Sequence, residues 1–298
     1  MTVGEMDFIK RLPVNALGRD FVCGDLHGSY SCLEKFLDRI YFDENKDRLI
    51  CCGDLVDRGP ENEKCLDLLY EPWFFTTKGN HEQMMEDFFR GRPLGNYWAP
   101  NGGRWGIQYG YEIISDIGQR VREIAFNKLG ALPYIITVEK KSGGVFHVLH
   151  SELDSEVPLT DTDLANEERL VELATRQTRD GDIIMWGRRI FYRLFDTCLD
   201  EHSVKKFKKT VFFEKLDRIF GPEHSHIYSG HTNVRRPVRL AGQTNLDTKA
   251  WGSYPEQGRY GVVNPAAWCG LTVTEPETDR FWLVNDNQFT ETSPLCIM

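Results

Sequence analysis

The chain has 298 residues, which is long enough for one large α/β domain or two small domains with a sizeable buried core. Its net charge of −9 and sequence pI near 5.5 argue against a broad nucleic-acid-binding face. The eight cysteines form no CxxC pair, and no apolar run reaches the length of a signal peptide or a membrane span. We therefore expect a soluble protein with reduced thiols in a cytosol-like compartment, without nucleic-acid or membrane partners.

Strand-like and helical segments alternate in the first third of the chain. Three apolar runs have strand character, at residues 20–23, 48–52 and 73–77. Helical stripes of apolar residues separate or follow them, at residues 29–40, 61–70 and 82–89. Such an alternation builds parallel strands joined by helical crossovers, so the loops after the strands should lie at the carboxyl edge of one sheet. Ligands of open α/β proteins bind at that edge.

Each of the three loops combines glycine with acidic residues, histidine or asparagine. They read Gly-Asp-Leu-His-Gly at residues 24–28, Gly-Asp-Leu-Val-Asp-Arg-Gly at 53–59 and Gly-Asn-His-Glu at 79–82. Oxygen and imidazole groups that converge at one edge are typical of a metal site, and glycines beside them let the backbone come close. The sequence therefore predicts a metal site built from all three loops.

The segment from residue 90 to 110 is rich in glycine, proline and asparagine, and it contains Trp98 and Trp105. Long irregular segments within compact domains are often lids or binding loops, so we expect a cap or lid over about residues 90–130. The alternative is that the tryptophans only pack this segment against the core.

The rest of the chain should alternate between helices and short strands. Helical structure is expected at residues 113–129, within 158–179, and at 198–220. Strands are expected at residues 134–139, 145–149, 226–229, 237–240, 244–246, 271–274 and 281–284, the last two as a closing hairpin. Since no repeat, low-complexity tract or linker divides the sequence, we expect residues 1–298 to form a single domain with strands from both halves of the chain.

The three loops match, without a substitution and in the same order, the motifs GDxHG, GDxVDRG and GNHE of the phosphoprotein phosphatase (PPP) family of calcineurin-like metallophosphoesterases. The sequence most resembles the small bacterial and phage serine/threonine protein phosphatases of the lambda-phosphatase type. The resemblance implies an α/β fold in which a two-sheet β-sandwich is flanked by helices in four αββα layers, with the metal loops at one end. It also implies a cytoplasmic protein, which as a phage enzyme would act in the host cytoplasm.

The resemblance further implies two divalent metal ions, whose bridging hydroxide attacks the phosphate ester. Asp54 would bridge the ions, with Asp25 and His27 as the other protein ligands of the first ion. The remaining ligands, all of the second ion, would be Asn80, His150 and His231. Mixed oxygen and imidazole ligands suit manganese, iron or zinc better than calcium or magnesium, and manganese is the expected metal.

Two of these histidines rest on shorter patterns than the three loops. His150 follows the apolar run 145–149, whereas its competitor His147 lies inside that run. His231 stands in a Gly-His-Thr sequence after a strand-like segment, as in the small enzymes that the chain resembles. We therefore expect His150 and His231, rather than His147, to be ligands.

The resemblance assigns proton transfer and phosphate binding to further residues. His81 would be the general acid that protonates the leaving alkoxide, oriented by Asp57. Arg58 would bind phosphoryl oxygens through its planar guanidinium, together with a second arginine in a Trp-Gly-Arg-Arg sequence. That second arginine is Arg188 or its neighbour Arg189, and we favour Arg188.

One position departs from the family pattern. Where the family usually has Asp-Thr-Gly-Ala, this sequence has Lys249 in place of the glycine. A lysine would be costly there if the backbone had a positive φ, and its long side chain would reach over the site. The substitution therefore bears on substrate detail and leaves the metal chemistry intact.

By resemblance the protein is a metal-dependent phosphomonoesterase that acts on phosphoserine and phosphothreonine in proteins, with phosphotyrosine left open. The same two-metal centre would also suit a dinucleoside polyphosphate or cyclic nucleotide hydrolase. The related polyphosphate hydrolases, however, tend to lack the aspartate that this chain has at Asp57. A catalytically silent scaffold is a third hypothesis, which the full set of ligand types disfavours. Phosphorylated proteins or peptides are the expected partners, and no regulatory partner is indicated.

Overall fold

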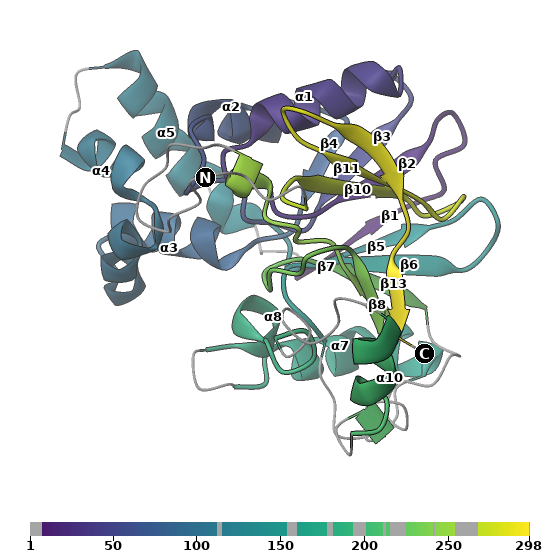
Figure 1. The fold of residues 1–298 in the computed structure, drawn as a ribbon. Coiled ribbons are helices and arrows are strands. Elements are labelled where there is room, and N and C mark those ends of the chain that lie inside the picture. Colours follow the sequence, from purple (N-terminus) through teal and green to yellow (C-terminus); the bar gives the residue numbers. More distant parts are fainter. Residues whose placement is uncertain are drawn as a thin grey trace.

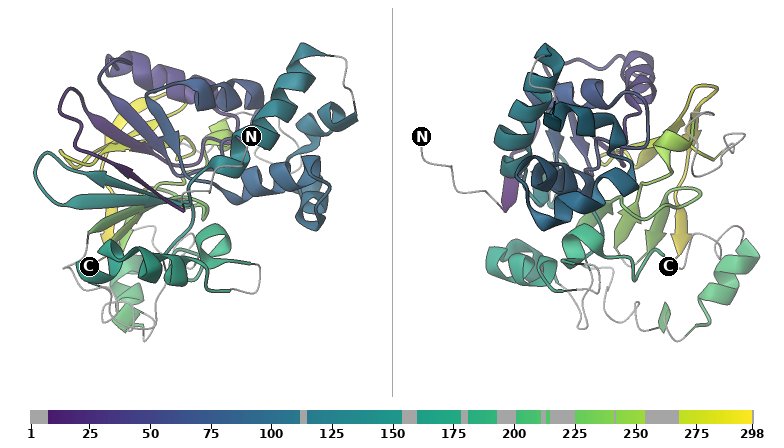
Figure 2. Two further views of the ribbon diagram at one scale, coloured as in Figure 1. Left: turned by 180° about the vertical axis from the view of Figure 1, so that it is seen from behind. Right: turned by 90° about the vertical axis from the view of Figure 1, so that its left-hand side faces the viewer.

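Two β-sheets face each other in the computed structural model, and helices cover their outer faces (Figure 1). The structure describes residues 8–111, 115–153, 160–177, 181–192, 201–210, 213–214, 225–240, 242–253 and 268–297. Figure 2 shows from behind that the layers follow one another as helices, sheet, sheet and helices. This is the two-sheet α/β sandwich that the sequence predicts.

The first sheet is built around the strands that precede the three predicted loops. Its strands are β2 (Asp20–Cys23), β3 (Arg48–Cys51), β4 (Phe74–Thr76), β10 (Leu271–Glu275), β11 (Arg280–Val284) and β12 (Phe289–Thr292). In space they follow the order β12-β11-β10-β2-β3-β4. β2, β3 and β4 run parallel, with Phe21 opposite Leu49 and Cys51 opposite Thr76. β10 lies antiparallel to β2, so the late hairpin joins the sheet formed by the start of the chain.

The second sheet combines strands from the middle and the end of the chain. Its strands are β1 (Ile9–Leu12), β5 (Ile135–Glu139), β6 (Val145–Leu149), β7 (His226–Ser229), β8 (Val238–Leu240), β9 (Gln243–Asn245) and β13 (Leu295–Ile297). They follow the order β1-β5-β6-β7-β9-β8-β13. β6 and β7 are parallel neighbours, with Val148 opposite Tyr228, so the residues that follow them meet at one edge.

The helices form three groups. Against the first sheet pack α1 (Tyr30–Arg39) and α2 (Asn62–Asp67), the latter continued by the 3₁₀ turn η1 (Leu68–Tyr70). Against the second sheet pack α6 (Asp161–Ala165), α7 (Glu167–Ala174), α8 (Ile183–Trp186) and α10 (Glu201–Phe207). The third group lies at one end of the sandwich and consists of α3 (Asn80–Phe89), α4 (Arg104–Tyr111) and α5 (Asp116–Asn127), with short 3₁₀ turns between and after them (Figure 1).

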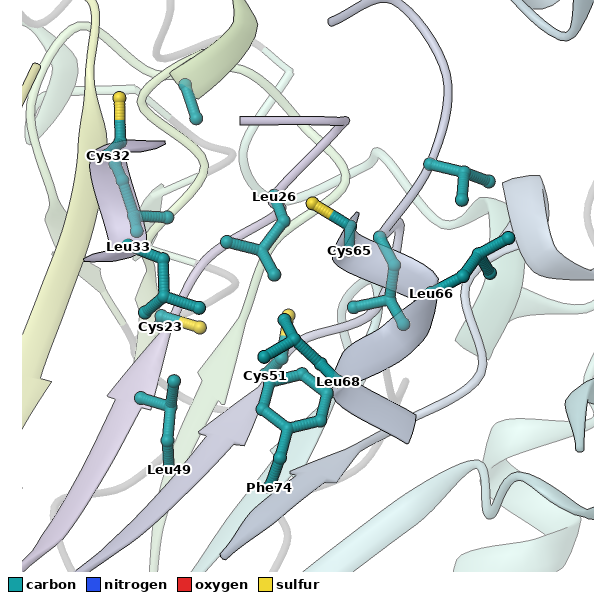
Figure 3. Packing of buried hydrophobic residues seen from close by; sticks show 14 of the residues in the cluster. Cys23, Leu26, Cys32, Leu33, Leu49, Cys51, Cys65, Leu66, Leu68 and Phe74 are labelled. Atoms are coloured by element: carbon teal, nitrogen blue, oxygen red, sulfur yellow. The ribbon is translucent and has the colours of Figure 1, made fainter. Parts of the chain in front are cut away.

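Alternating side chains divide the core into layers. On β2, Val22 packs between the two sheets with Ile50, whereas Phe21 points to the other face and packs under α1. Figure 3 shows part of this outer layer, where Leu33 and Leu66 meet the strands. Because both faces of the strands are covered, they read as continuous apolar runs in the sequence.

The cysteines within the described ranges belong to the core rather than to disulfide bonds. All seven are free thiols, and six of them are buried. Burial raises the pKa of the Cys51 and Cys52 thiols well above the usual range, so both act as small apolar residues. In these same parts of the chain, none of the helices has the length and apolar character that a membrane crossing requires.

Most of the predicted elements are present, with ends that differ by at most three residues. The helix predicted to begin at Glu82 begins two residues earlier, at Asn80. Gly79 has the extended backbone of an N-cap, and its N–H is accepted by the Glu82 carboxylate, which satisfies one donor of the first turn. Of the helix predicted at 198–220, the structure describes α10 and residues 208–210 and 213–214, whereas residues 198–200, 211–212 and 215–220 lie outside the described ranges.

Three strands were not predicted, namely β1, β12 and β13. Each is an edge strand of its sheet and has only three or four residues. Short edge strands carry few buried side chains, so they lack the apolar pattern by which a strand is found in a sequence.

Candidate active site

Five loops bring the predicted ligand residues together at one end of the sandwich. They follow β2 (Asp25, His27), β3 (Asp54), β4 (Asn80), β6 (His150) and β7 (His231). At most 4 % of the surface of each residue is exposed. The competitor His147 lies within β6, where its Nδ1 is 2.9 Å from the Thr137 hydroxyl, and it takes no part in the cluster.

Asp54 lies at the centre of the cluster. Its Oδ2 is 3.5 Å from His27 Nε2, and its Oδ1 is 3.4 Å from His150 Nε2. The two carboxylate oxygens therefore face two different groups of donor atoms. A carboxylate with this placement can bridge two metal ions.

The group on the Oδ1 side brings together the lone pairs of Asn80 Oδ1 and His150 Nε2 and a ring nitrogen of His231. His150 Nε2 lies 2.9 Å from Asn80 Oδ1 and 3.1 Å from His231 Nδ1. Since His150 Nδ1 donates to the Cys52 carbonyl over 2.9 Å, the neutral ring has no proton left at Nε2. Lone pairs that converge at such distances repel one another unless a cation lies between them, so this group fits a metal ion.

The group on the Oδ2 side contains Asp25 and His27. His27 Nδ1 donates to the Val56 carbonyl over 2.8 Å, which leaves Nε2 unprotonated, and Asp25 Oδ2 is 3.9 Å from that atom. Burial raises the pKa of Asp25 well above its usual range, and the charges of Asp247 and Asp54 raise it further. The negative charges of these buried carboxylates repel one another, and a positive ion between them would offset that repulsion, so this group also fits a metal.

Burial holds the imidazoles of the cluster in their neutral form. The pKa values of His27 and His231 lie well below the usual histidine range, first because the rings are buried and then because of the nearby charges of Arg58 and Arg188. The buried Nε2 of His231 also has no hydrogen-bond partner in the described parts of the chain. Neutral imidazole is the form that binds metals.

Several of these residues have a strained backbone. His27, Asp54 and His231 have φ values of 44°, 48° and 63°, which non-glycine residues rarely adopt and which cost about 1–3 kcal/mol each. Strain of this kind persists where surrounding contacts enforce it, and it gathers at functional sites. Gly79 shows how close the packing is, because an added Cβ would lie 2.2 Å from Asp54 Oδ1.

Glu82 holds the loop that carries Asp54. Its Oε2 accepts the N–H groups of Asp54 and Gly79 over 2.8 and 2.9 Å, and its Oε1 accepts that of Leu55 over 2.8 Å. No role is predicted for Glu82 from the sequence, although it is the last residue of the third motif. Its contacts with a loop 27 residues earlier could not be inferred from the motif alone.

Asp57 and His81 form a second arrangement beside the cluster. Asp57 Oδ2 accepts a hydrogen bond from His81 Nδ1 over 2.5 Å. Two indole N–H groups also donate to this carboxylate, that of Trp105 to Oδ1 over 2.7 Å and that of Trp98 to Oδ2 over 2.9 Å. Burial raises the pKa of Asp57 to about 7, while the Trp105 and Trp98 hydrogen bonds and the Arg58 charge oppose the rise. Every partner donates, so the geometry is that of an ionised carboxylate that orients the imidazole.

Both predicted phosphate-binding arginines lie at the cluster. Arg58 donates from Nη1 to His27 Nε2 over 2.6 Å and from Nη2 to His81 Nε2 over 3.0 Å. Arg188 donates from Nη1 to the carbonyl of His231 over 3.0 Å, and its charge acts on His81 and His231. Arg188 thus lies at the cluster, and the choice of Arg188 over Arg189 as the phosphate-binding arginine stays a prediction.

The family is established by comparison with known proteins. A family model described as "Calcineurin-like phosphoesterase" matches residues 21–234. The chain belongs to the calcineurin-like phosphoesterase family. The predicted family and fold are therefore confirmed.

Among members of this family, the chain is 46% identical over 230 residues to serine/threonine-protein phosphatase 1 of Salmonella typhimurium, which covers 77% of this chain and 86% of that protein. It is 41% identical over 64 residues to a symmetrical bis(5'-nucleosyl)-tetraphosphatase of Dechloromonas aromatica, covering 21% of this chain and 23% of that protein. A crystal structure of a candidate diadenosine tetraphosphatase superposes with a TM-score of 0.50 at 18% identity, over 97% of this chain and 98% of that one. At that identity the superposition supports the shared fold alone.

Proposed function

We propose that this protein is a metal-dependent protein phosphatase that removes phosphate from phosphoserine and phosphothreonine side chains. The observation that carries the proposal is the Asp57–His81 pair, whose imidazole stands beside the two donor groups that share Asp54. An imidazole in this position can protonate the alkoxide that leaves a phosphomonoester. The similarity to a serine/threonine phosphatase over most of both chains supports the same substrate class.

Two divalent metal ions are proposed to bind the donor groups. Asp25, His27 and Asp54 would hold one ion, and the other would be held by the far oxygen of Asp54 with Asn80, His150 and His231. Mixed oxygen and imidazole donors favour manganese, with iron and zinc as competitors. When bound, the ions would polarise the phosphoryl oxygens and lower the pKa of a water molecule that acts as nucleophile.

Arg58 and Arg188 are proposed to bind the phosphoryl group of the substrate. In the present structure His81 Nε2 accepts a hydrogen bond from Arg58, and burial lowers the pKa of His81 to about 3, so its ring is neutral. A phosphoryl dianion that binds Arg58 would remove this donor and place negative charge beside the ring. Both changes raise the pKa of His81.

His81 can then carry a proton at Nε2, while Nδ1–H stays hydrogen-bonded to Asp57. As the bond between phosphorus and the serine oxygen breaks, that oxygen takes the Nε2 proton and leaves as the alcohol. Water supplies the oxygen that phosphate gains, and the proton that this water loses returns to His81 Nε2, so that one water is consumed and the alcohol and hydrogen phosphate are released. Because His81 protonates the leaving oxygen as the bond breaks, no free alkoxide has to form.

The segment from 90 to 130 is proposed to act as a cap on one side of this site. Its Trp98 and Trp105 donate to Asp57, and Gly102 lies so close to Arg58 that an added Cβ would come within 3.0 Å of the arginine backbone nitrogen. These contacts support a role in shaping the site rather than core packing alone. The proposed setting is the bacterial cytoplasm, where phosphorylated proteins are available as substrates.

A dinucleoside polyphosphate hydrolase is the second candidate, because the chain also matches symmetrical tetraphosphatases over 21% of its length. Metal-stripped protein supplied with manganese should be compared on a phosphoserine peptide, a dinucleoside polyphosphate and a cyclic nucleotide. Faster turnover of the peptide supports the phosphatase if it is lost in Asp54→Asn and kept in a control, Asp43→Asn, whose half-exposed carboxylate lies in the connection between α1 and β3. Preference for the dinucleoside polyphosphate would favour the polyphosphate hydrolase over the phosphatase. No turnover of any substrate with any metal would favour a catalytically silent scaffold.

A further inference from the structure

Lys249 has a backbone conformation that suits glycine. Its φ is 60°, and its N–H donates to the Asp247 carboxylate over 3.0 Å, which holds the turn in place. A non-glycine residue in this left-handed region costs stability. The backbone of Lys249 therefore has the positive φ at which a lysine is costly.

The ammonium group of Lys249 lies against two indoles. Its Nζ is 4.4 Å from the ring centre of Trp251 and 6.0 Å from that of Trp268. Cation–π contacts of this kind fix the position of a long, otherwise mobile side chain. Within the described ranges the ammonium has no carboxylate partner, so its charge is not neutralised by these parts of the chain.

Trp251 also connects Lys249 with the site. The guanidinium carbon of Arg58 is 5.8 Å from the centre of the Trp251 ring. Together with the 4.4 Å between Lys249 Nζ and the same centre, this limits the separation of the two cations to at most about 10 Å. The guanidinium carbon of Arg235 lies 5.8 Å from the centre of the Trp268 ring.

An extended peptide advances about 3.3 Å per residue, so 10 Å corresponds to about three residues. A peptide whose phosphoryl group binds Arg58 can therefore place a side chain one to three residues away near Lys249. An anionic side chain would gain most from that ammonium group, because it adds an ion pair to the hydrogen bond that an uncharged acceptor could also form.

We propose that Lys249, held on Trp251, forms an anion-binding subsite that selects phosphopeptides with a second negative group within three residues of the scissile phosphate. This inference rests on the proposed phosphatase activity. The second group is a carboxylate or another phosphoryl group, since both carry the charge that the ammonium recognises.

The test compares two phosphoserine peptides that differ only by glutamate or glutamine at the second residue after the phosphoserine. The readout is the ratio of kcat/KM for the two peptides in each protein. The native protein should prefer the glutamate peptide by about two- to fivefold, as expected of one partly exposed ion pair, and high salt should reduce the preference. In Lys249→Met the ratio should fall to about one.

Lys10→Met is the matched control, because Lys10 Nζ also lies over an aromatic ring, that of Phe75, at 5.0 Å. It should keep the native ratio. Lys249→Gly should lose the preference too and, having no strain at this φ, should not melt below the native protein, which guards against a misfolded methionine variant. Replacing the glutamate by a second phosphoserine tests the other anion.

A native ratio near one, or a ratio that survives in both Lys249 variants, would overturn the subsite while peptide turnover still supports the phosphatase. If neither peptide is hydrolysed but the dinucleotide is, the proposed function and the subsite both fall. The two failures therefore give different results.

Discussion

The clearest test of the Asp57–His81 pair is Trp105→Phe, which removes an indole N–H and keeps an aromatic ring. The lost hydrogen bond, 2.7 Å long, donates to Asp57 Oδ1, which then keeps only the 3.1 Å bond from Trp98. A hydrogen bond to a charged group is worth about 1.5–3 kcal/mol. Since 1.36 kcal/mol corresponds to one pKa unit, the pKa of Asp57 should rise by about one to two units from its value of about 7.

The ionised carboxylate is the form that accepts His81 Nδ1–H, so activity should increase as the pH rises through the pKa of Asp57. In Trp105→Phe the acid limb of the profile of kcat against pH should therefore move upward by about one to two pH units. At pH 7 kcat should fall roughly five- to fiftyfold, and it should recover toward the native value at higher pH. KM should change less than kcat, because Trp105 acts through Asp57.

Trp73→Phe is the matched control. Trp73 is buried in the core, where it packs on Phe42 and Phe74, and its indole N–H has no hydrogen-bond partner in the described structure. This variant should lose some stability and keep the native pH profile. The reasoning is refuted if the Trp105→Phe profile coincides with the native one, or if its loss of activity is the same at every pH.

Three further predictions concern stability and metal binding. Glu86→Gln should lower the free energy of unfolding by about 3–5 kcal/mol, because it leaves the buried Lys78 ammonium without its partner at 2.5 Å. Burial raises the pKa of Glu86, but the hydrogen bond and charge of Lys78 outweigh burial and lower the pKa overall. The stabilisation is therefore fully present above the unfolded-state pKa of about 4.3, and it is lost as the pH falls through the lower pKa of the folded state. Urea unfolding at a series of pH values from 7 to 3 measures this loss. Glu82→Gln offers one acceptor oxygen to three N–H groups, which should cost about 1–3 kcal/mol in the same assay and weaken metal binding by about 10- to 100-fold in calorimetric titration. Manganese at 100 times its Kd should raise the unfolding free energy of metal-stripped protein by about 2.7 kcal/mol per site, and an unchanged melting curve, or an equal gain in Asp54→Asn, would contradict the proposed ligands.

The positions of Asp25, Asp54 and Asn80 could be predicted because they depend on local order. Each comes within four residues of the end of an apolar strand, and parallel strands carry such residues to one edge whatever the details of packing. His150 could be separated from His147 for a similar reason, since one follows the buried run and the other lies within it.

Contacts across long stretches of sequence could not be predicted in this way. Trp98 and Trp105 reach Asp57 from 41 and 48 residues away, and their direction depends on how α3 and α4 pack together. From the sequence, these tryptophans fitted a lid and core packing equally well. The contact of Arg58 with His27 could not be predicted either. The motif identifies Arg58, but the direction of its side chain depends on how the loops fold.

The pairing of β10 with β2 has a consequence for the order in which the protein can form. Val273 of β10 lies opposite Cys23 of β2, so β2 pairs with a strand that comes about 250 residues later in the chain. At a synthesis rate of about 5–20 residues per second, β2 waits roughly 12 to 50 s on the ribosome before that neighbour is made. During this time one side of β2 presents unpaired N–H and C=O groups, which invite pairing with other chains. We expect the nascent chain to depend on chaperones for this interval, although the finished sheet has β2 in its interior.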